Sequence, residues 1–241
     1  MIKKLLYNGK TDFILEAHSA LSAKIVEEAG FPGIWISSLS MSSSWGVKDN
    51  NELTMTQALE VLESITDVVS VPVLFDGDTG YGDCNHFQRL VRKLESRNCF
   101  GVCIEDKKFP KRNSFIRPEE QSLEDISVFC DKIKAGKDIQ RHSDFSIIAR
   151  TETLITGATM EEALLRAHAY ADAGADAILI HSKKNNVSEV DEFVKLWNGR
   201  IPIACIPTKY SSTPVEKFKD LNISLIIWAN HMLRASILST K

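Results

Sequence analysis

Residues 71–80 read VPVLFDGDTG, a short apolar run that ends abruptly in two aspartates and two glycines. The run is continuously apolar and does not alternate with polar residues, which is typical of a strand buried on both faces. Similar runs recur along the chain, and we predict eight strands: Phe13–Leu15, Gly33–Ile36, Val71–Phe75, Gly101–Ile104, Phe145–Ala149, Ala177–Ile180, Ile201–Ile206 and Ile223–Trp228.

The segments between these runs have the periodicity of amphipathic helices. Gly30 and Gly174 stand where a helix end needs a residue that tolerates a left-handed conformation. Thr213 and Pro214 predict a helix that starts with a threonine N-cap and a proline at the first helical position. Eight strand–helix units without a GxGxxG motif predict an α/β fold, a single (β/α)8 TIM-type barrel over residues 1–241.

The composition is that of an ordinary soluble protein, with 44% hydrophobic and 25% charged residues. The net charge of -3 gives no general attraction to nucleic acid or to an anionic membrane, so we expect a small-molecule substrate drawn in by local cations. No signal-peptide core follows Lys3 and Lys4, and the 5 cysteines form no CxxC pair. These features predict a cytoplasmic protein with free thiols.

Carboxylates follow two neighbouring predicted strands at the end of the barrel where such folds carry their active sites. Asp76 and Asp78 follow the third strand, and Glu105 follows the fourth. Three converging carboxylates repel one another unless a cation neutralises them, and oxygen ligands without His or Cys select a hard ion such as Mg²⁺. The alternative, a solvated Asp-rich turn, is the usual fate of an isolated DGD sequence.

Two long connections can fold over this end of the barrel. Residues 105–114 read EDKKFPKRNS, and their four Lys and Arg side chains suit a substrate phosphate, although a solvated charged loop is the alternative. Residues 46–51 read GVKDNN and follow a serine-rich run after the second strand. By its residue type alone, Asp49 in this loop is equally well explained as a turn residue.

Several motifs together resemble the phosphoenolpyruvate mutase family of the phosphoenolpyruvate mutase/isocitrate lyase superfamily. They are residues 76–82 (DGDTGYG), 105–114 (EDKKFPKRNS), 181–184 (HSKK), 207–210 (PTKY) and 228–231 (WANH), and the similarity runs from Glu16 to about Ala235. The resemblance implies an Mg²⁺-dependent isomerase that interconverts phosphoenolpyruvate and phosphonopyruvate. This reaction forms the C–P bond in phosphonate biosynthesis.

The resemblance also implies roles for individual residues. Asp76, Asp78 and Glu105 would hold Mg²⁺, directly or through water, and Asp49 would be the catalytic aspartate. Two routes are open for Asp49: covalent attack on phosphorus, or positioning of a loosely bound phosphoryl group. The substrate would be bound by Trp35, Ser37, Ser38 and Leu39 at its pyruvyl end, by Arg150 and His181 at its anionic groups, and by Lys111, Asn113 and Ser114 at its phosphoryl oxygens.

Two features depart from the family pattern. Ile36 and Ser38 stand where members often carry glycine, which bears on the backbone amides expected to hold the pyruvyl end. The chain also stops shortly after the eighth predicted strand, whereas relatives continue with helices that pack on a neighbouring subunit. The expected homo-oligomer, a tetramer in relatives, therefore stays open.

Three alternatives remain beside the mutase. Phosphonopyruvate hydrolase would share the metal site, and Asn113 favours the mutase over it. C–C lyases of the superfamily use a cysteine followed by Gly-His, and none of the five cysteines here has that context. A catalytically silent barrel is disfavoured because Asp49, Arg150 and His181 are present together with all three metal carboxylates.

Overall fold

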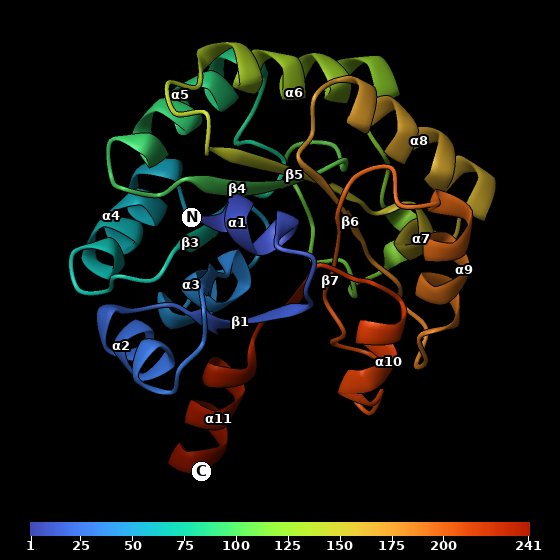
Figure 1. The fold of residues 1–241 in the computed structure, drawn as a ribbon. Coiled ribbons are helices and arrows are strands. Elements are labelled where there is room, and N and C mark those ends of the chain that lie inside the picture. The colour runs from blue at the N-terminus through green and yellow to red at the C-terminus, as the bar shows by residue number, and fades with distance from the viewer.

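Eight parallel strands close into a barrel in the computed structural model, which describes residues 1–241 (Figure 1). Each strand pairs with the next one along the chain, and β8 pairs with β1 to close the sheet. Every strand overlaps one predicted apolar run, so the predicted (β/α)8 barrel is confirmed. The strands are β1 Asp12–Ala17, β2 Ile34–Ile36, β3 Val73–Asp76, β4 Gly101–Glu105, β5 Ser146–Thr151, β6 Ala177–Ile180, β7 Ile203–Cys205 and β8 Leu225–Trp228.

Helices surround the barrel because each presents one apolar face to it. In α5, for example, Phe87, Leu90, Val91 and Leu94 are buried at helical spacing, while the opposite face is polar. The helices are α1 Ile2–Tyr7, α2 Ala20–Glu28, α3 Ser38–Ser44, α4 Met55–Thr66, α5 Cys84–Glu95, α6 Ile126–Ile139, α7 Thr153–Thr156, α8 Met160–Asp172, α9 Ser188–Trp197, α10 Val215–Asp220 and α11 His231–Thr240, with a 3₁₀ turn η1 at Pro118–Glu120.

The apolar core has two parts. A cluster of 44 buried residues fills the space between the barrel and its helices. A second cluster of 13 residues fills the barrel interior and includes Trp35 and Leu74. Ile2 and Leu6 of α1 belong to this inner cluster, and Figure 1 shows α1 lying across the barrel. One end of the barrel is thus closed by the chain itself, which leaves the opposite end for a ligand.

Three of the predicted helix-end residues can be compared with the structure. Gly30 and Gly174 directly follow Ala29 and Ala173, the C-cap residues of α2 and α8, with φ of 84° and 101°, so both predictions are confirmed. The predicted start of α10 is wrong by one residue. Pro214 itself is the N-cap, with ψ of 143°, because its carbonyl already accepts a hydrogen bond from the N–H of Lys217.

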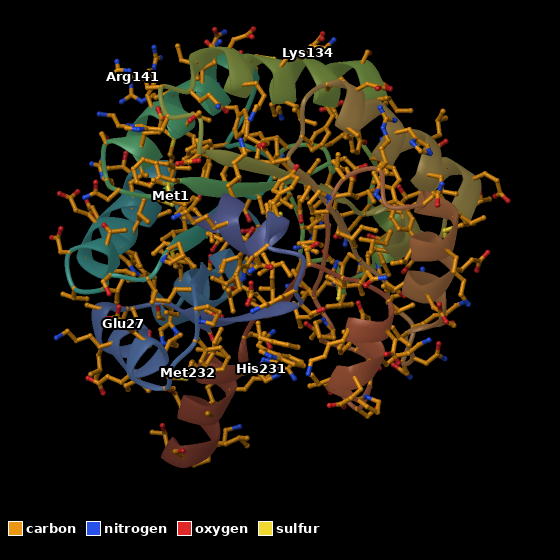
Figure 2. The ribbon with its side chains drawn as sticks, in the orientation of Figure 1. Met1, Glu27, Lys134, Arg141, His231 and Met232 are labelled. Carbon is orange, nitrogen blue, oxygen red and sulfur yellow. The ribbon has the colours of Figure 1, made fainter.

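The last helix, α11, leaves the body of the barrel. Figure 2 shows His231 and Met232 at its start, and Figure 1 shows the rest of the helix running outward to the C-terminus. No residue of α11 is buried, and Leu238 is 75% exposed. No helix in the chain is both long enough and apolar enough to cross a membrane.

The tight packing of α6 on the barrel gives a stability prediction. A Cβ at Gly136 would overlap the ring of Phe87 and lie 2.8 Å from Cδ1 of Ile147. Alanine favours a helix over glycine by about 1 kcal/mol, but overpacking costs about 1–3 kcal/mol. We expect Gly136→Ala to lower the free energy of unfolding by up to about 2 kcal/mol in urea denaturation. The exposed Lys134→Ala on the same helix should have almost no effect; a stabilised Gly136→Ala would contradict the packing described here.

Candidate active site

A pocket opens at the carboxyl ends of the strands, opposite α1. The predicted site residues line it, with the single exception of Asp78, which is buried just behind the pocket wall. The lining residues are Trp35, Ser37, Ser38, Leu39, Asp49, Asp76, Glu105, Lys111, Asn113, Ser114, Phe115, Arg150, His181, Ile206, Thr208, Ala229, Asn230 and Arg234.

The DGD turn after β3 is held against the end of β4. Gly77 donates its N–H to the carbonyl of Cys103 at 2.8 Å, and a Cβ there would lie 2.8 Å from Cγ2 of Val102. Asp78 has a left-handed φ of 49°, and its carbonyl accepts the N–H of Glu105 at 2.7 Å. The glycine therefore permits a close approach that brings Asp76 and Glu105 to one corner of the pocket, with Asp78 buried behind them. We call these three residues the carboxylate corner.

The end of β2 binds Asp76. The N–H and the hydroxyl of Ser38 donate to Oδ2 of Asp76 at 3.1 and 2.9 Å. The Ser38 amide, predicted to hold the pyruvyl end of a substrate, is therefore committed to a carboxylate in this structure. Ser37 forms the N-cap of α3, where its Oγ accepts the N–H of Ser40.

Lys111 of the long β4–α6 connection lies at the centre of the carboxylates. We call residues 106–125 of this connection the lid. The ammonium of Lys111 is 2.6 Å from Oδ1 of Asp49 and 2.7 Å from Oδ1 of Asp78, and it donates to Oγ of Ser38 at 2.9 Å. Burial alone would lower the pKa of Lys111, but Asp78, Asp49 and the other carboxylates raise it well above its usual value, so the side chain stays charged.

Asp49 and the lid contact each other over the pocket. Asn113 donates its side-chain N–H to Oδ2 of Asp49 at 2.8 Å. Burial would raise the pKa of Asp49, but Lys111 and Asn113 lower it, and the net shift is downward. Asn51, in the same loop as Asp49, also contacts the lid. Its side-chain N–H donates to Oδ2 of Asp78 at 3.0 Å, and its side-chain Oδ1 accepts the backbone N–H of Lys111 at 2.7 Å. Asp49 is therefore an ionised carboxylate in a closed site.

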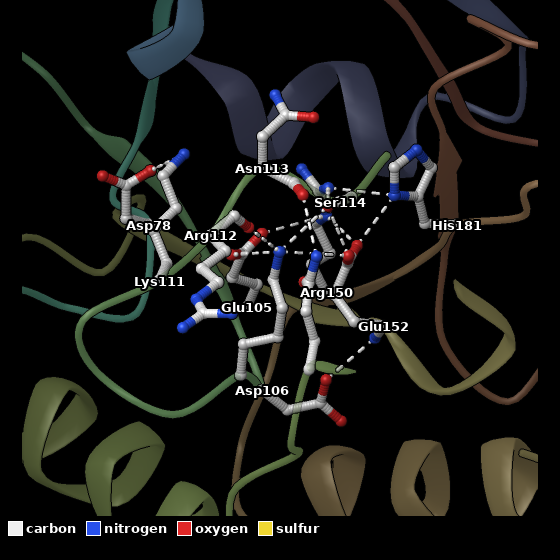
Figure 3. Close-up of polar contacts among 12 residues, drawn as sticks. Asp78, Glu105, Asp106, Lys111, Arg112, Asn113, Ser114, Arg150, Glu152 and His181 are labelled. Atoms are coloured by element: carbon white, nitrogen blue, oxygen red, sulfur yellow. Dashed lines mark hydrogen bonds and ion pairs between the residues drawn. The ribbon is translucent and has the colours of Figure 1, made fainter. Parts of the chain in front are cut away.

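A second group of charges lies on the β5–β6 side of the pocket (Figure 3). Nε of Arg150 is 2.6 Å from Oε1 of Glu152 and 3.5 Å from Oε2 of Glu105. His181 Nδ1 is 2.7 Å from Oε1 of Glu152, and its buried Nε2 has no protein partner. Burial and the Arg150 guanidinium lower the pKa of His181 against the opposing pull of Glu152. A neutral imidazole nitrogen is thus free for a ligand.

The carboxylate corner fits a hard divalent cation held partly by water. No group of three His, Cys, Asp or Glu side chains is close enough to bind a metal ion directly. Mg²⁺ commonly keeps several waters and uses one or two carboxylates, so this arrangement suits it. Burial raises the pKa of Asp76, and burial together with Asp76, Asp49 and Glu105 raises that of Asp78 to about 7. The corner is therefore short of positive charge despite Lys111.

Sequence reasoning missed several residues of the site. The sequence does indicate that Glu152 lies near the site, because it follows Arg150 by two residues at the end of a strand, but it does not predict the contacts of Glu152. Thr208 and Asn230 also follow strands, whereas Arg234 on α11 had no signal at all. Arg234 lines the pocket without any carboxylate within ion-pair distance, unlike Lys111 and Arg150.

Comparison with known proteins shows the family of this chain. It matches the family model of phosphoenolpyruvate phosphomutase over residues 2–241. It is 50% identical over 236 residues to a phosphoenolpyruvate phosphomutase of Tetrahymena pyriformis, covering 98% of this chain and 79% of that protein. The chain belongs to the phosphoenolpyruvate phosphomutase family.

Solved structures of two different activities share the fold of this chain. A phosphoenolpyruvate phosphomutase from Streptomyces platensis subsp. rosaceus superimposes with a TM-score of 0.93 at 44% identity, covering 95% of this chain and 80% of the other. A phosphonopyruvate hydrolase in complex with oxalate and Mg²⁺ also gives a TM-score of 0.93, at 36% identity and 99% and 82% coverage. The barrel alone therefore does not distinguish a phosphomutase from the hydrolase.

Proposed function

We propose that this protein is a phosphoenolpyruvate mutase that interconverts phosphoenolpyruvate and phosphonopyruvate. The observation that carries the proposal is the contact between Asp49 and the lid residues Lys111 and Asn113, which puts an ionised carboxylate beside an ammonium group and an amide that would bind the phosphoryl oxygens. The high identity to a phosphomutase supports the same conclusion. In the forward direction the P–O bond to the enol oxygen breaks and a P–C3 bond forms, so the reaction is an isomerisation without water.

The groups that line the pocket would contact the substrate from three sides. Lys111, Asn113 and Ser114 on the lid offer donors to the oxygens of the phosphoryl group. Arg150 and the unpartnered Nε2 of His181 offer contacts to the substrate on the β5–β6 side. Trp35, Ser37 and Leu39 line the β2 side, where the pyruvyl end would lie. This arrangement keeps the pyruvate fragment in place while the phosphoryl group changes its partner atom.

The cation belongs at the carboxylate corner. Asp76 would hold Mg²⁺, with Asp78 and Glu105 acting through water. When bound, the ion would stabilise negative charge on the oxygens of the enolate. The Mg²⁺ in the related hydrolase structure supports this choice of ion.

Asp49 acts on the phosphoryl group in either of two ways. As a nucleophile it would bond to phosphorus while the enolate leaves, and the enolate C3 would then take the phosphoryl group back. As a positioning residue it would orient a loosely bound phosphoryl group between the two pyruvate atoms. Both routes need an ionised Asp49 and a site without free water, which the lid provides by covering the pocket.

Phosphonopyruvate hydrolase is the second candidate, because a hydrolase structure superimposes on this chain as closely as a mutase structure does. A cysteine-dependent lyase is not proposed. None of the five cysteines lines the pocket, and burial raises the pKa of the Cys99 thiol to about 12.

The substrate test uses ³¹P NMR on the protein with phosphonopyruvate and Mg²⁺. We expect phosphoenolpyruvate to appear as the phosphorus-containing product. Inorganic phosphate with an equal amount of pyruvate would instead identify a hydrolase. No turnover with either phosphonopyruvate or phosphoenolpyruvate would overturn both candidates.

Replacing Asp49 should abolish turnover without disturbing the fold. Asp49→Asn keeps the side-chain size but removes the charge that both routes require, so we expect kcat to fall at least about 100-fold. Asp67→Asn at the exposed end of α4 removes the same charge away from the pocket and should leave kcat unchanged. Steady-state rates and thermal unfolding of both variants make the comparison; an active Asp49→Asn variant would remove Asp49 from the mechanism.

The metal assignment can be tested without measuring activity. Mn²⁺ can replace Mg²⁺ as a spectroscopic probe, and its binding can be followed by electron paramagnetic resonance. We expect Asp76→Asn to weaken Mn²⁺ binding on the order of 10-fold or more, because a ligand oxygen and its charge are lost. Asp67→Asn serves as the matched control here too. Equal Mn²⁺ affinity in Asp76→Asn and the control would show that the cation does not bind at this corner.

A further inference from the structure

Glu152 is completely buried and does not line the pocket, yet its side chain contacts groups that do. Its Oε1 accepts a hydrogen bond from Nε of Arg150 at 2.6 Å and lies 2.7 Å from Nδ1 of His181. Its Oε2 accepts a short hydrogen bond from the hydroxyl of Ser114. One carboxylate therefore connects both substrate anchors of the rim with a phosphoryl-binding residue of the lid (Figure 3).

The charge on Glu152 is maintained by its surroundings. Burial would raise its pKa, but Arg150, Lys107 and His181 lower it well below the usual range. Lys107, at the start of the lid, lies 3.4 Å from Oε2 and also donates to the carbonyl of Arg112 at 2.6 Å. Glu152 thus binds the lid through a hydroxyl and through an ammonium group.

The backbone of residue 152 is attached to the base of the lid as well. Its N–H donates to Oδ1 of Asp106 at 2.8 Å, and the hydroxyl of Tyr170 donates to Oδ2 of Asp106 at 2.6 Å. The carbonyl of Asp106 accepts the N–H of Glu124, near the far end of the lid, at 2.8 Å. Arg166 donates to the carbonyl of Glu124 at 2.8 Å. Both ends of the lid therefore meet close to Glu152.

From these contacts we infer that Glu152 is the positioning residue that fixes the closed lid to the substrate anchors of the barrel rim. It acts through Ser114, Arg150 and His181 and does not touch the substrate. The inference rests on the proposed mutase function, because the geometry matters only if a phosphoryl group must be kept from water. Without the carboxylate, Arg150 and Lys107 lose a buried counter-charge, and Ser114 loses the acceptor that holds the lid in register.

A misplaced lid admits water, and water is the competing acceptor for the phosphoryl group. In that side reaction the P–C bond of phosphonopyruvate breaks, the hydroxyl of water joins phosphorus, and a proton is taken up at C3. The products are pyruvate and inorganic phosphate. The ratio of phosphate to phosphoenolpyruvate therefore reports how well the lid is held, and a role confined to stability would not change it.

The test is Glu152→Gln, which keeps the side-chain shape and removes the charge. We expect kcat to fall about 10- to 100-fold with a smaller change in KM, because the groups are misplaced and not removed. We also expect the fraction of phosphonopyruvate that ends as phosphate to rise several-fold over the wild type in ³¹P NMR. An unchanged kcat and an unchanged phosphate fraction would overturn the inference.

A second measurement follows the lid without any substrate. The side chain of Arg112 is 62% exposed, Lys108 is exposed as well, and neither is followed by proline, so trypsin can cut the lid after these residues when it opens. We expect faster cleavage in Glu152→Gln than in the wild type; equal rates would contradict the attachment. If the wild type turned over neither substrate, the proposed function would fail, while this cleavage assay would still decide the role of Glu152.

Two further variants separate attachment from folding. Asp172→Asn, at the exposed end of α8, removes a carboxylate that pairs with Arg200 on the surface and should match the wild type in every readout. Ser114→Ala removes the hydroxyl contact between the lid and Glu152, together with the hydrogen bond that Nη2 of Arg150 donates to Ser114 at 3.0 Å. It leaves the Lys107 contact and the pairing of Glu152 with Arg150 and His181. It should shift cleavage and phosphate release in the same direction as Glu152→Gln, and it keeps the test decisive if the glutamine variant is too unstable to purify.

Discussion

Charge compensation across the pocket is the constraint on which the site depends. The strand ends bury Asp76, Asp78, Glu105 and Glu152 within one small region, and the barrel itself supplies Arg150, which forms ion pairs with Glu105 and Glu152 only. Buried charges are costly unless they are paired. The remaining cations, Lys107 and Lys111, come from the lid, and so closing the lid neutralises the rim.

The same constraint explains why the site would take a metal ion. With the lid raised, the carboxylates would exceed the cations, and even in the closed state burial raises the pKa of Asp76. A divalent cation offsets that excess more effectively than a single ammonium group. Closure of the lid, binding of a cation and binding of an anionic substrate would therefore be linked, because each would change the charge that the others meet. This linkage suits an enzyme that must close around its substrate before a phosphoryl group is released.

The fold does not determine which reaction follows. A mutase and a hydrolase superimpose on this chain equally well, so the difference between them must lie in side chains and in the exclusion of water. Asn113 and Ser114 contact opposite sides of the pocket, Asn113 through Asp49 and Ser114 through Glu152. Those two contacts attach the lid to the loop of Asp49 and to the end of β5.

The sequence by itself determined the barrel, because strands that are buried on both faces are apolar whatever their neighbours are. It also placed Asp76, Asp78 and Glu105 at the same end of the barrel, because the carboxyl ends of the strands converge in any such barrel. It left Asp49 open between a turn and a catalytic residue, and it missed the contacts of Glu152. Only the tertiary structure shows the contacts of these two residues, since a residue after a strand or in a loop acquires its partners from segments far along the chain. Asp49 meets Asn113, and Glu152 meets Ser114, only after the barrel has closed and the lid has folded across its end.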